Sequence, residues 1–94
     1  MATMIIRHKV GNFENWKRVY DALGPTRKEA NVISASVHRD GTDPNTVVIM
    51  HQFTDMPSAL EFSNSPVLKT AMSRAGVISE PVLWFTEDVE LTAH

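Results

Sequence analysis

The sequence predicts an α+β fold of the ferredoxin-like, split βαβ kind, in which helices pack on one face of an antiparallel sheet. Two observations lead to this prediction. The segments with strand and helix patterns follow one another in the order strand, helix, strand, strand, helix, strand. No stretch rich in Pro, Gly or Ser divides the chain, so we expect residues 1–94 to form a single domain.

The first half of the chain provides a strand and a helix. Residues 4–10 are rich in β-branched side chains and are followed by Gly11. Asn12 is suited to cap a helix that ends near Leu23, because its side chain can accept a hydrogen bond from a free amide of the first turn. The apolar positions of this helix are Phe13, Trp16, Tyr20 and Leu23. Gly24-Pro25 interrupts it, and residues 26–30 can resume a helical turn.

The second half begins with two further strands. Residues 32–39 alternate, which places Ile33, Ala35 and Val37 on one side, and a turn-rich segment then leads to the more apolar strand 47–53. Asp55 and Ser65 mark helix starts, each followed closely by a proline. Gly76 ends the helical region, and residues 82–89 form the last strand.

Both faces of the predicted sheet carry apolar side chains, since Ile5 lies beside Ile6 and Trp84 beside Leu83. Helices of the same chain cover only one of these faces. The sheet of a second copy is the natural cover for the other. We therefore expect a homodimer built as a dimeric α+β barrel.

Composition excludes several classes of partner. The net charge is −2, and neither Lys and Arg nor Asp and Glu cluster into a run, which disfavours nucleic acid and membrane surfaces. No apolar run approaches the length that spans a bilayer, and the N-terminus does not resemble a secretion signal, so a cytoplasmic location is the default expectation. The absence of cysteine excludes thiolate chemistry.

The candidate catalytic residues are His8 and His51. By the two-residue period of strands, His8 shares a face with Ile6, and His51 shares one with Ile49. If these faces coincide, both imidazoles converge on one cavity between sheet and helices, where they can act as acid, base or orienting group. The alternative is that each is a structural histidine that satisfies hydrogen bonds.

Aromatic side chains could line the same cavity, although aromatics at this spacing equally serve as core. These candidates for substrate binding are Trp16, Tyr20, Phe53, Phe62 and Trp84. No metal-ligand pattern, phosphate loop or dinucleotide fingerprint occurs, so we expect no metal and no cofactor.

Several motifs together resemble the antibiotic biosynthesis monooxygenase superfamily, the dimeric α+β barrel proteins. They are RHKV at residues 7–10 followed by Phe13 and Trp16, DPN at 43–45 leading to QFTD at 52–55, and SPVLKTAM at 65–72. The resemblance implies the fold and a pocket for a small apolar molecule. The superfamily contains cofactor-free oxygenases of aromatic polyketides, haem-degrading enzymes, isomerases, cyclases and members without known activity.

The resemblance also shows departures at individual positions. Met72 stands where haem-degrading members carry the iron-ligating histidine, which leaves it as a candidate substrate contact. His8 and Phe53 stand where oxygenases tend to have an asparagine and a tryptophan.

Three functions follow from this resemblance. The first is a cofactor-independent monooxygenase acting on an apolar, aromatic or polyketide-like molecule, with His8 as proton acceptor. The second is a cyclase or isomerase that uses the same pocket without consuming oxygen. The third is a non-catalytic, ligand-binding or stress-associated protein.

Overall fold

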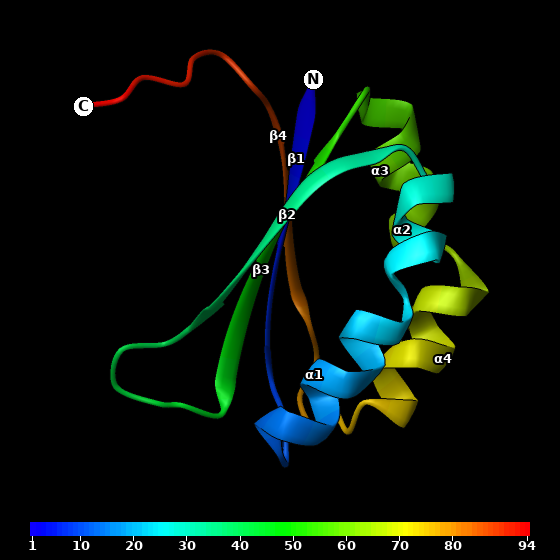
Figure 1. Ribbon diagram of the computed structural model, residues 1–94, viewed down its shortest axis with the longest axis vertical. Coiled ribbons are helices and arrows are strands. Elements are labelled where there is room, and N and C mark those ends of the chain that lie inside the picture. The colour runs from blue at the N-terminus through cyan, green and yellow to red at the C-terminus, as the bar shows by residue number, and fades with distance from the viewer.

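The computed structural model describes residues 1–94 and contains a four-stranded antiparallel sheet with four helices on one face (Figure 1). The strands lie in the order β2-β3-β1-β4, which is the predicted ferredoxin-like arrangement. The elements are β1 (Ala2–Lys9), α1 (Phe13–Ala22), α2 (Gly24–Glu29), β2 (Val32–Arg39), β3 (Thr46–Phe53), α3 (Met56–Ser63), α4 (Pro66–Arg74) and β4 (Val82–Glu87). None of the helices is long and apolar enough to cross a membrane.

The helices begin where the sequence provides a cap. The Asn12 side-chain oxygen accepts a hydrogen bond of 2.8 Å from the Asn15 amide, and Asp55 caps α3 in the same way through the Ser58 amide at 2.8 Å. Pro25 occupies the first turn of α2, where no amide hydrogen is needed. The first helix therefore ends near Leu23 as predicted, but α2 begins at Gly24 and includes the Gly-Pro pair, two residues earlier than expected.

The register of the sheet decides which side chains face the helices. Ile6 lies opposite Ile49 in the β1–β3 pair, and Met4 lies opposite both His51 on β3 and Phe85 on β4. Because side chains alternate along a strand, His8 falls on the same face as these residues. The two predicted catalytic histidines therefore face the helices together.

One expected face assignment on β2 is wrong. A register irregularity between Val32 and Ser34 places Val32 opposite Phe53, where it packs against the core. Ile33 is displaced from the side of Ala35 and Val37 and is 51% exposed. An irregularity of this type interrupts the alternation on which the expectation depended. β3 is the more buried strand of the hairpin, as expected.

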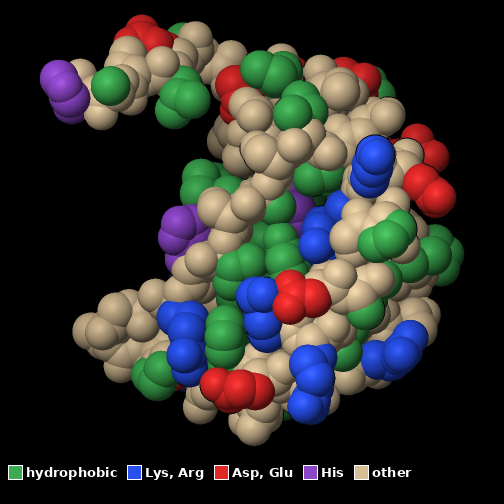
Figure 2. Space-filling view, in the orientation of Figure 1, with side chains coloured by type: hydrophobic (Ala, Val, Ile, Leu, Met, Phe, Trp, Pro, Cys, Tyr) green, Lys and Arg blue, Asp and Glu red, His purple; other side chains and the backbone are tan.

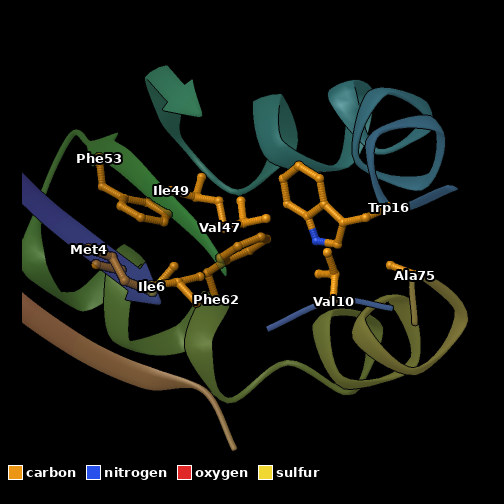
Figure 3. Close-up of a cluster of buried hydrophobic side chains, with 10 residues drawn as sticks. Met4, Ile6, Val10, Trp16, Val47, Ile49, Phe53, Phe62 and Ala75 are labelled. Atoms are coloured by element: carbon orange, nitrogen blue, oxygen red, sulfur yellow. The ribbon is translucent and has the colours of Figure 1, made fainter. Parts of the chain in front are cut away.

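The hydrophobic core fills the space between the sheet and the helices (Figure 3). Phe53 and Phe62 pack against each other with ring centroids 5.7 Å apart, while Trp16 brings α1 onto the same cluster. The complete set of buried core residues is Met4, Ile6, Val10, Trp16, Val47, Ile49, Phe53, Ala59, Phe62 and Ala75.

The other face of the sheet has no cover within the chain. Ile5 lies between Met50 on β3 and Trp84 on β4, and Trp84 is 48% exposed. The molecule is hollowed on the side away from the helices, between the β2–β3 loop and the C-terminal segment (Figures 1 and 2). This uncovered surface, defined by Ile5, Val48, Met50, Val82 and Trp84, is called the open face below.

Candidate functional site

Two buried histidines lie on the helix-covered face of the sheet. His8 on β1 and His51 on β3 are each 4% exposed. None of their four ring nitrogens has a hydrogen-bond partner in the chain. Buried polar groups in proteins are nearly always paired, and an unpaired one costs about 1–3 kcal/mol. The alternative from the sequence, in which each histidine makes a hydrogen bond that supports the fold, is therefore not observed within the chain.

Helix α1 places two aromatic rings between the histidines. Trp16 and Tyr20 are one helical turn apart, and their rings stack with centroids separated by 5.1 Å. The Trp16 ring meets His8 edge-on at 6.0 Å, and the Tyr20 ring is stacked toward His51 at 6.4 Å. The four rings form a continuous aromatic wall along the sheet.

All four residues of this wall line a small apolar cavity of about 50 Å³. The cavity lies between strands β1 and β3 of the sheet and the helices α1 and α4. Its lining residues are Ile6, His8, Trp16, Val19, Tyr20, Leu23, Ile49, His51, Leu68, Ala71, Met72 and Ala75. A second cavity of about 50 Å³ lies on the other side of Tyr20 and His51 and reaches Arg27 and Phe62. Each is large enough for water but not for a multi-ring molecule.

Burial keeps both imidazoles neutral at pH 7. Loss of solvation lowers the pKa of His8 from 6.5 to about 4. The pKa of His51 also falls to about 4, mainly through burial and further through the positive charge of Arg27. Arg27 is fixed beside the site because its Nη1 donates to the Tyr20 carbonyl oxygen at 2.6 Å and its guanidinium lies 3.8 Å from the centre of the Tyr20 ring.

A wider groove opens to the surface next to the histidine cavity. It lies between α1 and α4, has a volume of about 450 Å³, and shares Val19, Leu23 and Ala71 with the cavity. This volume falls in the range of about 300–1,000 Å³ typical of small-molecule sites. A modest separation of α1 from α4 would join groove and cavity into one site.

The structure brings together most of the residues predicted for the site. His8, His51, Trp16, Tyr20 and Met72 line the same cavity. The other three predicted contacts lie elsewhere. Phe62 meets His51 edge-on with centroids 5.7 Å apart and lines the neighbouring cavity. Phe53 is fully buried and packs beneath His51 as core. Trp84 is on the open face, so its assignment to this pocket is wrong.

Sequence reasoning missed Val19, Leu68 and Arg27 as parts of the site. Leu68 lies one helical turn before Met72, and this spacing could have indicated that both share a face. No comparable signal marks Arg27, because its contact with Tyr20 depends on the turn between α1 and α2. No group of three or more His, Cys, Asp or Glu side chains is arranged to hold a metal ion.

Solved structures with this architecture include known and candidate oxygenases. A mutant of SnoaB, a cofactor-independent oxygenase from Streptomyces nogalater, is 13% identical and superimposes with a TM-score of 0.77 over 99% of this chain and 97% of that one. A candidate antibiotic biosynthesis monooxygenase from Bordetella bronchiseptica gives a TM-score of 0.79 at 13% identity, with 95% and 97% covered. A conserved protein from Methanosarcina mazei gives 0.74 at 15% identity, with 95% and 94% covered.

These structures have the same fold as the present chain, and the sequence identifies its family. The antibiotic biosynthesis monooxygenase family model matches residues 2–74. The chain therefore belongs to this family. A comparison with curated protein sequences finds no match.

Proposed function

We propose that this chain is a cofactor-independent monooxygenase that oxidises an apolar molecule of aromatic or polyketide-like character. Family membership supports a monooxygenase-like role. The observation that carries the proposal is the pair of buried histidines whose ring nitrogens have no partner. A substrate hydroxyl or acidic C–H placed against these nitrogens would give them the partner that no group of the chain provides.

In the proposed reaction the substrate itself supplies the electrons. A CH₂ group activated by neighbouring aromatic or carbonyl groups loses a proton to the neutral imidazole of His8. The resulting carbanion reacts with dioxygen, one oxygen atom becomes the new carbonyl, and the other leaves as water. The sum is CH₂ + O₂ → C=O + H₂O, which requires no external reductant.

The low basicity of His8 in the empty site is compatible with this role. A free imidazole whose pKa is about 4 is a weak base, but a carbanion formed beside it would stabilise the imidazolium and raise that pKa. Trp16 and Tyr20 stack on each other, so they would contact a substrate as part of the apolar lining of the cavity. His51 lies at the Tyr20 end of this lining and would orient a polar group of the substrate.

The test uses anthrone as substrate and an oxygen electrode as readout. We expect the wild-type chain to raise oxygen uptake above the rate in buffer and to form the corresponding quinone. His8→Phe, which keeps an aromatic ring but removes the base, should lower the rate by a factor of about 10² or more. The matched control is His38→Gln, because His38 is exposed and hydrogen-bonds only to Ser36. Equal rates for wild type and His8→Phe would remove His8 from the mechanism.

A second candidate function is ligand binding without turnover. The small size of the cavity, about 50 Å³, favours it, because a ligand alone requires a smaller movement of α1 or α4 than a substrate together with dioxygen. Binding of anthrone with neither oxygen uptake nor product would support this function. Product formation under argon would instead indicate a cyclase or isomerase.

We also propose that the chain forms a homodimer through the open face. Its apolar side chains, Ile5, Met50 and Trp84 among them, form one contiguous row on a hollowed surface. A patch of this kind on a sheet is covered in most proteins by a partner. Because the surface belongs to an unbroken sheet, the complementary sheet of a second copy is the simplest cover. Sedimentation equilibrium should give twice the chain mass, and a stable monomer would contradict the proposal.

A further inference from the structure

Two arginines border the groove between α1 and α4. Arg18 comes from the middle of α1, Arg74 is the last residue of α4, and both are exposed. No aspartate or glutamate lines the groove. The full lining is Asn15, Arg18, Val19, Ala22, Leu23, Pro66, Val67, Thr70, Ala71 and Arg74. The groove therefore combines an apolar floor with positive charge.

These guanidinium groups differ from the other three in the chain because they have no strong partner. Arg7 pairs with Asp40 at 3.0 Å, Arg27 is held by Tyr20, and Arg39 donates to the Pro44 carbonyl oxygen at 2.8 Å. By contrast, Arg18 makes only a long hydrogen bond of 3.3 Å to Asn15, and Arg74 makes no side-chain hydrogen bond or ion pair. Their donors are available to a ligand.

The histidine cavity itself contains no positive charge. His8 and His51 are neutral at pH 7, and the remaining wall is apolar or aromatic. An anionic ligand would therefore place its apolar part toward the histidines and its charged group toward the groove. The shared residues Val19, Leu23 and Ala71 make the two spaces adjacent, so separation of α1 from α4 would let one molecule contact both.

We infer that Arg18 and Arg74 form an anion-binding entrance to the histidine cavity, and that the ligand is an apolar, ring-containing molecule that bears a carboxylate. Guanidinium groups bind carboxylates through charge-assisted, often bidentate hydrogen bonds. The inference rests on the proposed function, since it names the substrate class of the same site.

The experiment compares two probes of nearly the same shape, the anion 2-naphthoate and the neutral 2-naphthamide. Isothermal titration calorimetry with the full chain should show that the naphthoate binds about tenfold more tightly or better. Arg18→Gln/Arg74→Gln should abolish this preference while leaving naphthamide affinity within about twofold. Because both arginines are exposed, the double variant should fold normally.

Lys69→Gln is the matched control, because it removes a positive charge from the same helix α4 but from a residue outside the groove. It should change naphthoate affinity by about twofold or less. Equal binding of the two probes, no binding of the naphthoate, or an equal loss in Lys69→Gln would each overturn the inference.

The outcome is separable from that of the oxygenation test. A chain that binds the naphthoate through the arginines but consumes no oxygen with anthrone would contradict oxygenation alone. A chain that oxidises anthrone but does not discriminate between the probes would contradict the anionic ligand class alone.

Discussion

The two faces of the sheet are built from alternate residues of the same strands, yet only one of them is covered by the helices. On β1, Met4 and Ile6 are buried beneath the helices, whereas Ile5 between them lies in the open face. The four helices all pack on one side. Comparable hydrophobicity on the two faces thus serves two purposes: one face makes the core and the cavity, and the other remains available to a partner.

The largest difference between the faces should appear when their tryptophans are truncated. Trp16 is 4% exposed and contacts His8 and Tyr20, so Trp16→Ala should lower the free energy of unfolding by about 3–5 kcal/mol. The measurement is urea denaturation followed by circular dichroism. Since Trp16 is buried within one chain, the loss should not depend on protein concentration.

Trp16→Phe and Trp84→Ala provide the controls. Trp16→Phe keeps an aromatic ring in the wall and should remain folded if the alanine variant does not, with a smaller loss of stability. Trp84→Ala removes a side chain from the open face, so its effect should grow at concentrations where the dimer is populated. If alanine at Trp16 and at Trp84 lowered the free energy of unfolding equally, at all protein concentrations, the division between the two faces would be contradicted.

The second difference concerns pH. The helix-covered face contains two histidines whose pKa is about 4 when folded and 6.5 when exposed. Since the unfolded chain binds protons more readily, stability is fully present above pH 6.5 and is lost as the pH falls toward 4. A shift of this size corresponds to ~3 kcal/mol for each histidine. Urea denaturation at pH 7.5 and pH 4.5 should reveal most of this loss.

Replacing a buried histidine should remove the part of the pH dependence of the free energy of unfolding that this histidine contributes. His8→Phe eliminates two unpartnered buried nitrogens, so the variant should be at least as stable as wild type at pH 7 and more stable at pH 4.5. His38→Gln should behave like wild type at both values, because His38 is exposed. A loss of stability for His8→Phe at pH 7 would indicate that the imidazole makes a bond that the single chain does not contain.

The sequence was sufficient to predict the elements that are governed by local rules. Asn12 and Asp55 cap helices, α1 ends before Gly24-Pro25, and alternation placed His8 with Ile6 and His51 with Ile49, whereas the pairing of β1 with β3 was needed to show that these two faces coincide. These features depend on short-range hydrogen bonding and on the period of a strand.

Features that depend on distant contacts could not be predicted in this way. Alternation places Trp84 and Leu83 on opposite faces of the sheet. Only the pairing of the buried Met4 with Phe85 shows that the side of Leu83 and Phe85 is turned toward the helices. The displacement of Ile33 arises from an irregularity in strand pairing that the alternating pattern does not reveal. Arg18 and Arg74 line the same groove because α1 packs beside α4, and nothing in either helix alone indicates this.

The third and smallest expected difference tests the open face directly. Trp84→Lys places a charge within the proposed dimer interface while leaving the core untouched. Tryptophans that anchor an interface commonly contribute about 2 kcal/mol or more, so the dimer dissociation constant should rise about thirtyfold or more. Sedimentation equilibrium over a concentration series gives this constant for each variant.

Ser73→Lys is the matched control for charge, since Ser73 is an exposed residue of α4 on the helix side of the molecule. It adds the same charge but should leave the dissociation constant unchanged, because α4 packs on the helix-covered face of the sheet (Figure 1) and Trp84 lies on the open face. If Ser73→Lys dissociates the dimer and Trp84→Lys does not, the copies associate through their helices. The open face would then require a different partner, and its apolar row would have to be explained by a ligand or another protein.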